Sequence, residues 1–202
     1  MKFSIIIPAH NSEEYLGYAL HSVREQTFRD YELIVICDAC TDKTVELAKE
    51  YADIVKEVDF SCDGPTRNAG LDLASGDWVL FMDDDDWFLH EFVLEQLDKK
   101  LNENPDIDIL AFSFIFRGMK YATPKGNNGQ YWIAVWSKCW RRSFIGKTRF
   151  PSLYMKSDVP FHRELMAKHP RILSWDMPMY YYNYLRIGSQ TANHKAKLQK
   201  KS

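Results

Sequence analysis

The chain has 202 residues, the size of one domain, and 46% of them are hydrophobic while 27% are charged. This composition is typical of a globular protein. A formal net charge of -2 argues against nucleic acid as a partner, because that kind of binding depends on many phosphate contacts. No uninterrupted apolar run approaches the ~20 residues of a membrane-spanning helix. We therefore expect a single domain over residues 1–202.

Strand and helix patterns alternate along the first half of the chain. Ile5, Ile6 and Ile7 form a continuous apolar run, which predicts a strand buried on both faces, as in a parallel sheet. The expected strands are 3–8, 31–37, 54–58, 78–82 and 106–116, and the expected helices lie near 16–23, 45–51, 66–74 and 88–101. This alternation predicts an α/β fold with a doubly wound, mostly parallel sheet and helices on both faces.

The second half has a more aromatic and less regular pattern, which we interpret as a smaller unit beside the sheet. The expected elements are a polar loop over 120–130, a strand-like aromatic segment over 131–140, a helix from Ser157 to Pro170, strands over 171–175 and 179–185, and a frayed basic tail over 194–202.

The four cysteines, Cys37, Cys40, Cys62 and Cys139, lack the spacing of a disulfide framework. Cys37 and Cys40 form a C-x-x-C pair, but no second ligand pair at zinc spacing accompanies it. The surroundings typical of thioredoxin-like redox motifs are also missing. Free thiols favour a reducing, cytoplasmic location.

Residues 76–87, GDWVLFMDDDDW, contain a short apolar strand that ends in four aspartates, Asp83 to Asp86. Four like charges repel each other at a strand end that water screens poorly, so a cation is expected there. Mg²⁺ typically binds through one or two carboxylates together with substrate phosphates. The carboxyl ends of strands are also where ligands bind in open α/β sheets. The alternative is that one or two of the aspartates cap the next helix.

Three stretches in order, SIIIPAHN, ELIVICDACTD and GPTRNAGLDLASGDWVLFMDDDDW, resemble the family 2 glycosyltransferases of GT-A fold. More loosely, VWSKCWRRSFI and SDVPFHRELM resemble acceptor-side blocks of the bacterial polysaccharide and lipopolysaccharide branch. The resemblance implies a nucleotide-sugar-binding half over 1–116 and an acceptor-binding half over 117–193. It also implies a nucleotide-diphosphate sugar donor (often a UDP-sugar), Mn²⁺ or Mg²⁺, a glycan or lipid-linked acceptor, and a role in cell-surface polysaccharide synthesis.

The same resemblance assigns donor-site roles to individual residues. Asp38 would hydrogen-bond the base, Asp83 would contact the ribose or sugar, and Asp85 would coordinate the metal. Arg67 would approach the phosphates, for which a guanidinium is well suited, although a surface ion pair is the alternative. The remaining residues matched to nucleotide-sugar binding are Pro8, Ala9, His10, Glu13, Gly64 and Asp84.

For the reaction, the resemblance implies inversion at the anomeric carbon and a general base on the acceptor side. The family usually has a Glu-Asp pair at a helix start, where this chain has Ser157-Asp158. We expect Asp158 to be the base, with a helix cap as the alternative role. Trp136 and Lys138 match an acceptor-side block, although aromatic core packing is the alternative for Trp136.

Several departures and rival functions remain open on the sequence. Cys37 replaces a carboxylate that is common in the nucleoside pocket, and His10 replaces a common aromatic residue. A different Mg²⁺ enzyme would need a D-x-D after the first strand or an N-terminal Gly-rich phosphate loop, and neither is present. A catalytically inactive relative that binds nucleotide sugar or glycan stays an alternative because of Ser157. The basic tail favours a solvated, disordered segment, and a weak peripheral contact with an anionic membrane is the alternative.

Overall fold

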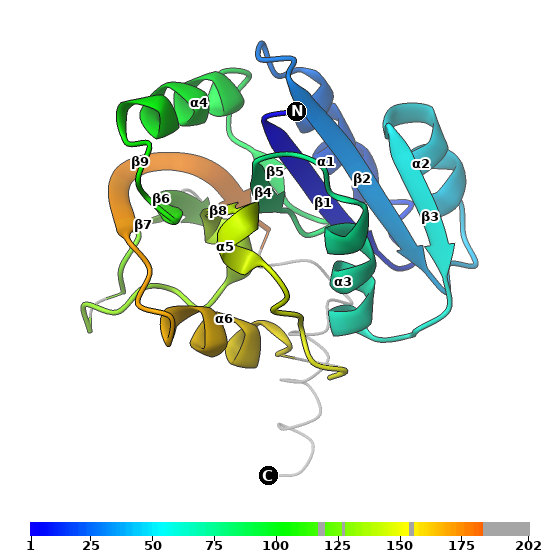
Figure 1. The fold of residues 1–202 in the computed structure, drawn as a ribbon. Coiled ribbons are helices and arrows are strands. Elements are labelled where there is room, and N and C mark those ends of the chain that lie inside the picture. Colours follow the sequence, from blue (N-terminus) through cyan, green and yellow to red (C-terminus); the bar gives the residue numbers. More distant parts are fainter. Residues whose placement is uncertain (117–119, 127, 154–155, 184–202) are drawn as a thin grey trace, which may run out of the picture.

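The computed structural model describes residues 1–116, 120–126, 128–153 and 156–183. In this part of the chain the strands form one sheet in the order β3-β2-β1-β4-β8-β6-β9-β5, and β7 pairs with β6 (Figure 1). The strands are β1 (Phe3–Ala9), β2 (Tyr31–Asp38), β3 (Ile54–Val58), β4 (Trp78–Phe81), β5 (Trp87–Phe88), β6 (Ile109–Phe116), β7 (Lys120–Ala122), β8 (Lys138–Arg141) and β9 (Ile172–Tyr182). The helices are α1 (Leu16–Arg24), α2 (Thr44–Tyr51), α3 (Asp63–Leu73), α4 (Val93–Glu103), α5 (Arg142–Ile145) and α6 (Asp158–Met166), with a 3₁₀ turn, η1 (Val135–Ser137).

The first four strands in space, β3, β2, β1 and β4, are parallel, as the alternating pattern predicts. Alternate residues of β1 enter two separate hydrophobic cores. Ile5 and Ile7 pack in the core shared with α1, α2 and α4, whereas Ile6 packs in the core shared with α3, α5 and α6. Helices therefore cover both faces, which confirms the doubly wound α/β expectation.

A buried carboxylate fixes β4 beside β1. Glu32 Oε1 accepts hydrogen bonds from Ser4 Oγ at 2.6 Å, from the backbone N of Ser75 at 2.6 Å and from that of Gly76 at 3.2 Å. Burial opposes ionisation, but these donors lower the pKa of Glu32 below its ordinary value. The turn before β4 is thereby held in place, and the aspartates after β4 emerge next to the end of β1.

Beyond β4 the sheet becomes mixed. β8 runs antiparallel to both β4 and β6, while β9 runs parallel to β6. β9, orange in Figure 1, curves around this side of the molecule after a register shift opposite Phe112 and Ser113. The far end of β9 pairs with β5, where Trp87 lies opposite Tyr181. The second half thus returns to the edge of the aspartate turn.

Four elements differ from the sequence prediction, and the first three concern a helix, a loop and the last strands. The helix expected over 88–101 begins later, at Val93, because the strand pairing of Trp87 and Phe88 with β9 holds that segment extended. The expected loop over 120–130 includes the short strand β7. The two late strands are one strand, β9, and its predicted continuation beyond 183 lies outside the described residues.

The segment 131–140 was expected to be strand-like and is largely not. It contains the 3₁₀ turn η1, and only its last residues enter β8. The carbonyls of Trp132 and Ala134 point to Lys138 Nζ, with 2.9 Å from Nζ to the Ala134 oxygen, so they are not free to pair with a neighbouring strand. A buried lysine therefore replaces strand pairing here.

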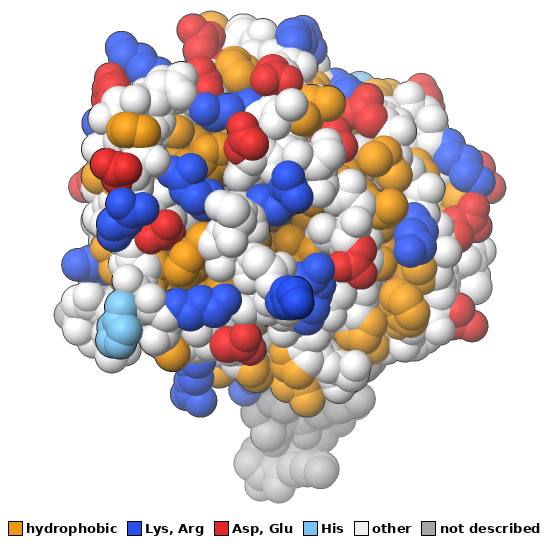
Figure 2. Space-filling model, in the orientation of Figure 1, with side chains coloured by type: hydrophobic (Ala, Val, Ile, Leu, Met, Phe, Trp, Pro, Cys, Tyr) orange, Lys and Arg blue, Asp and Glu red, His pale blue; other side chains and the backbone are white. Residues whose placement is uncertain are grey.

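The helices and the charged surface bear on whether the domain could cross a membrane or present a patch of one charge. Within the described ranges, no helix combines the length and apolarity required to cross a membrane. On the face shown in Figure 2, Lys and Arg side chains are interspersed with Asp and Glu side chains. The basic tail over 194–202 lies outside the described residues.

Candidate active site

The loops after β1 and β4 are tied together at the carboxyl ends of the parallel strands. Asp84 Oδ2 accepts a hydrogen bond from the backbone N of His10 at 3.3 Å and another from Ser12 Oγ. His10 Nδ1 lies 2.6 Å from the backbone oxygen of Asp38. The strand ends β1, β2 and β4 therefore converge, with His10, Asp38 and Asp84 at one edge of the sheet.

The carboxylate of Asp38 organises the segment after β3. Oδ1 accepts from the backbone N of Phe60 at 2.7 Å and of Ser61 at 2.9 Å, while Oδ2 accepts from Cys62 N at 3.0 Å and Thr66 Oγ1 at 2.6 Å. Burial opposes ionisation, but these four donors lower the pKa of Asp38. A hydrogen bond to a nucleobase would have to share oxygens that already accept two bonds each.

Glu13 holds a neighbouring loop. Its Oε2 accepts from the backbone N of Lys43 at 3.0 Å, and its own N donates to Asp42 Oδ2 at 3.1 Å. Glu13 is exposed, whereas Ala9 is buried and paired with Cys37, and Pro8 is paired with Ile36. The residues matched to the nucleoside thus form a rim built from β1 and the loops beside it.

Two thiols lie under this rim. Cys37 is buried and Cys40 is half-buried, with Cys40 Sγ 3.5 Å from the backbone oxygen of Ala9. The two thiols hydrogen-bond to each other, and this bond lowers the pKa of Cys40 to about 7, while His10 adds to the effect. The same bond, together with burial, raises the pKa of Cys37. Cys40 is therefore an ionisable group next to His10.

The four aspartates after β4 have different environments. Asp83 pairs with Arg67, 2.8 Å from Oδ1 to Nη2, yet burial raises the pKa of Asp83 to about 7. Asp86 is fully buried and accepts from Tyr180 Oη at 2.7 Å, and burial raises its pKa well above the ordinary value. Asp85 is half-buried. Since α4 begins at Val93 without a side-chain cap, the alternative that these aspartates cap that helix is wrong.

This donor set suits a hard divalent cation that also binds phosphate. The turn offers carboxylate oxygens, which Mg²⁺ and Mn²⁺ accept. Among the residues that the structure describes, no group of three or more His, Cys, Asp or Glu side chains is arranged so that it could hold a metal ion by itself. A metal at this turn would thus depend on ligands from the substrate, as is usual when a diphosphate completes the coordination.

Arg67 lies behind the aspartate turn and is only 5% exposed. It contacts both Asp83 and Asp63, the latter four residues earlier on α3. The alternative of a surface ion pair is therefore wrong. Gly64 sits at the start of the same helix, where a Cβ atom would lie 2.0 Å from the Pro151 carbonyl oxygen. Close packing between α3 and the segment before α6 accordingly requires a glycine.

Asp158 is the first residue of α6 and is half-buried. Its charge helps to raise the pKa of Arg67. The N-cap position of α6 is Ser157 and no side chain caps the helix, so the alternative that Asp158 is the N-cap is wrong. A carboxylate in the first helical turn still suits the helix dipole. Ser157 is fully buried, and its Oγ donates to Asp63 Oδ2 at 2.8 Å.

Trp136 and Lys138 lie beneath the surface. The Trp136 ring stacks on Tyr180 with centroids 4.9 Å apart and meets Phe114 edge-on at 4.7 Å. Lys138 is 0% exposed, donates through Nζ to three oxygens of the 132–137 segment, and has its pKa lowered to about 7 by burial. Both side chains are therefore buried, and core packing, the alternative for Trp136, is confirmed.

Sequence reasoning missed Ser12, Asp63 and Tyr180. Ser12 and Tyr180 contact aspartates more than 70 positions away in the chain, which no local pattern reveals. Asp63 precedes Arg67 by four residues, and that helical spacing was a usable signal for an ion pair.

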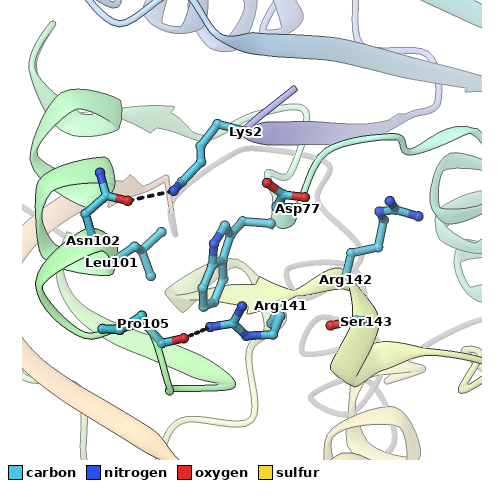
Figure 3. A pocket seen from close by; sticks show the side chains of 9 residues that line it. Lys2, Asp77, Leu101, Asn102, Pro105, Arg141, Arg142 and Ser143 are labelled. Carbon is cyan, nitrogen blue, oxygen red and sulfur yellow. Dashed lines mark hydrogen bonds between the residues drawn. The ribbon is translucent and has the colours of Figure 1, made fainter.

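A cavity of about 330 Å³ lies at the opposite end of β4 (Figure 3). Its lining includes Lys2, Asp77, Arg141 and Arg142. Arg141 Nε donates to the Ile107 oxygen at 2.8 Å, and Arg142 Nη2 donates to that of Ser75 at 3.1 Å. These guanidinium groups hold strands and turns together, so the residues lining the cavity have structural contacts and lie outside the candidate site.

A parallel sheet whose strand ends carry a run of carboxylates and a buried arginine defines a ligand-binding α/β domain of GT-A architecture. The family model described as Glycosyl transferase family 2 matches residues 4–160, and the chain belongs to this family.

Individual relatives agree with this assignment. Poly(ribitol-phosphate) beta-N-acetylglucosaminyltransferase TarS of Staphylococcus aureus (strain Mu50 / ATCC 700699) is 36% identical over 99 residues, 45% of this chain and 17% of TarS. The crystal structure of S. aureus TarS 1-349 with UDP-GlcNAc matches with a TM-score of 0.82 and 26% identity, covering 95% of this chain and 61% of that one. The mannosyltransferase PcManGT from Pyrobaculum calidifontis, solved with GDP-Man and Mn²⁺, shares the fold with a TM-score of 0.72 at 16% identity, covering 96% and 60%. The chain spans less than two thirds of each of these relatives.

Proposed function

We propose that the chain transfers a sugar, with inversion, from a nucleotide-diphosphate sugar to a hydroxyl group of a glycan or lipid-linked acceptor. A UDP-sugar is the favoured donor, and cell-surface polysaccharide synthesis is the favoured role. Family membership and the likeness to a TarS structure with UDP-GlcNAc support this reading. The observation that carries it is the set of contacts that joins the residue before Asp158 to the aspartate turn: Ser157 Oγ donates to Asp63, and buried Arg67 pairs with both Asp63 and Asp83.

The donor would bind along the carboxyl ends of β1, β2 and β4. His10 and Glu13 would border the nucleoside, together with the rim of Pro8 and Ala9, and Asp38 would hold the base or the segment that touches it. Arg67 and Gly64 would face the diphosphate, with Asp83 and Asp84 shaping the ribose and sugar side. Charge-assisted bonds from a guanidinium suit phosphate oxygens, which supports the orientation.

Asp85 is proposed to hold Mn²⁺ or Mg²⁺. When bound, such an ion neutralises the charge of the departing nucleoside diphosphate. The oxygen-only donor set of the aspartate turn supports this assignment, as does the Mn²⁺ in the solved structure of PcManGT. Asp86, held by Tyr180, would keep the turn in shape.

Asp158 is proposed to accept the proton of the acceptor hydroxyl. It lies at the start of α6, in the half of the chain assigned to the acceptor, and a carboxylate there needs no further group to act as a base. Trp136 and Lys138 would stiffen the wall beside it. A cytoplasmic location, with weak contact between the basic tail and the inner face of a membrane, rests on the sequence alone.

A screen of donors tests this proposal. Purified protein with Mn²⁺ would be incubated with UDP-GlcNAc, UDP-glucose and GDP-mannose, and nucleotide release would be measured with and without glycan acceptors. The proposal predicts release with at least one donor and a loss of 100-fold or more, on the order of an abolished general base, in Asp158→Asn. If neither wild type nor variant releases nucleotide while both bind it, the second candidate, a non-catalytic relative, replaces this proposal.

A further inference from the structure

One carboxylate, Asp63, joins the two halves of the candidate site. Asp63 Oδ2 accepts from Ser157 Oγ at 2.8 Å, and Asp63 Oδ1 pairs with Arg67 Nη1. Arg67 Nη2 in turn binds Asp83 Oδ1 at 2.8 Å. A continuous chain of polar contacts therefore runs from the residue before Asp158, through α3, to the aspartate turn after β4.

Ser157 and Arg67 are buried, and Asp63 and Asp83 are half-buried, so these contacts are shielded from most of the solvent and restrict the positions of the groups they join. Ser157 is 0% exposed and the Asp63 side chain 20% exposed. Charge-assisted bonds in such surroundings are short and directional, and removal of one partner leaves the other charge unpaired. Helix α3 also carries an exposed ion pair for comparison. Asp72 pairs with Arg149 at 2.7 Å, and the Asp72 side chain is 60% exposed. Surface pairs of that kind contribute little.

Ser157 and Asp63 depend on each other chemically. A serine hydroxyl donates to the Asp63 carboxylate, whereas a carboxylate at position 157 would face a like charge at hydrogen-bond distance. Position 157 is also where this chain has serine instead of the acidic residue expected before Asp158. A second carboxylate is therefore present at position 157, where it contacts Ser157, but it comes from α3.

We propose that Asp63 is a positioning residue for sugar transfer, which supplies this second carboxylate and sets α6, with Asp158, relative to Arg67. The inference rests on the proposed function. Asp63 acts through Ser157 and Arg67 and need not touch the donor or acceptor. A small displacement of a reacting group costs up to about 100-fold in rate, so the loss should appear in kcat more than in nucleotide affinity.

The test compares five variants with wild type, using kcat and KM for nucleotide release from the donor found active and the Kd of UDP with Mn²⁺. Asp63→Asn keeps the size but removes the negative charge that pairs with Arg67, and should lower kcat by about 10-fold to 100-fold while the Kd of UDP changes far less. Ser157→Ala should lower kcat by a smaller factor. Asp72→Asn, the matched surface change on α3, should leave all three constants unchanged.

Relocation of the charge gives the sharper result. Ser157→Asp alone places two carboxylates together and should be the least active variant. In the double variant with Asp63→Asn, the carboxylate stands at position 157 and the hydrogen-bond donor at position 63. The like-charge contact is removed, so kcat should be higher than in Ser157→Asp alone. Circular dichroism and the Tm of each variant establish whether it is folded. If the charged variants do not fold, the kcat of Ser157→Ala provides the test of the contact with Asp63.

Three outcomes decide the matter. Recovery in the double variant, with a kcat effect confined to Asp63 and Ser157, supports the inference. If wild type turns over but Asp63→Asn has the same kcat as Asp72→Asn, the positioning role is overturned while the proposed function stands. The same holds if the folded double variant has a kcat no higher than that of Ser157→Asp. No turnover by wild type on any donor overturns the proposed function, and this inference with it.

Discussion

Tyr180 Oη donates a hydrogen bond to Asp86 Oδ2 at 2.7 Å and accepts one from the backbone N of Asp83 at 3.1 Å. A single hydroxyl near the end of β9 thus spans the aspartate turn after β4. Both Tyr180 and Asp86 are fully buried, so water does not replace either bond. The shape of the candidate metal-binding turn therefore depends on the second half of the chain.

Tyr180→Phe should destabilise the protein and weaken UDP binding in the presence of Mn²⁺. Loss of the hydroxyl leaves Asp86 Oδ2 and the backbone N–H of Asp83 without this partner, which costs about 1–3 kcal/mol, although Asp86 Oδ1 keeps its bond from the backbone N of Asn183. Urea unfolding measures the free energy of unfolding, and calorimetry measures the Kd of UDP. Tyr181→Phe is the control, because the ring of Tyr181 stacks on Trp87 at 4.3 Å and is preserved by the change. Equal effects of the two variants would contradict the role of the Tyr180 hydroxyl.

Gly64→Ala should cost about 1–3 kcal/mol of stability, since its Cβ would lie 2.0 Å from the backbone oxygen of Pro151 and neither backbone segment yields cheaply. Gly17→Ala is the matched change in α1, where a Cβ meets nothing within 4 Å. That variant should gain roughly 0.5–1 kcal/mol, the usual preference of a helix for alanine. The two values of Tm should move in opposite directions, and a neutral Gly64→Ala would show that α3 does not pack closely against this segment.

Which features can be predicted from the sequence depends on how far apart in the chain the contacting residues lie. The parallel strands follow from local apolar runs such as Ile5 to Ile7, and the aspartate turn follows from its place after β4. The distinct roles of Asp84 and Asp86 do not, because their partners lie more than 70 residues away. Trp87 and Phe88 form a strand against a helical pattern for the same reason, since β9 pairs with them from the other end of the chain.

Because of His162, the free energy of unfolding should depend on pH between about pH 4 and 6.5. Burial, with a further contribution from Lys138, lowers the pKa of His162 from 6.5 to about 4. Between these values the unfolded chain holds a proton that the folded chain does not, so the free energy of unfolding rises with pH, by at most about 1.4 kcal/mol per pH unit. Urea unfolding at several pH values should show a flatter profile for His162→Phe than for wild type. The exposed His169→Asn should keep the wild-type profile, and an unchanged slope in His162→Phe would contradict the assignment.

Cys40 should react with iodoacetamide near neutral pH, because hydrogen bonding from Cys37 lowers the pKa of Cys40 to about 7. In a Cys62→Ser background, mass spectrometry should find one fast-reacting thiol whose rate has its midpoint near that pH, while the buried Cys37 and Cys139 react only on unfolding. If the nucleoside rim lies above Cys40, UDP with Mn²⁺ should slow the reaction. A fast thiol that UDP leaves unprotected would place the nucleoside elsewhere.

The most direct test of the account is a calorimetric titration of UDP, with and without Mn²⁺, on wild type, Asp85→Ala and Asp77→Ala. Asp77 lies at the opposite end of β4, beside the cavity of Figure 3, and serves as the control. The account predicts that UDP binds wild type and Asp77→Ala in a manner that depends on Mn²⁺, and that Asp85→Ala loses this dependence. Metal-dependent binding that survives in Asp85→Ala, or no nucleotide binding by wild type under any metal condition, would contradict the donor site proposed at the aspartate turn.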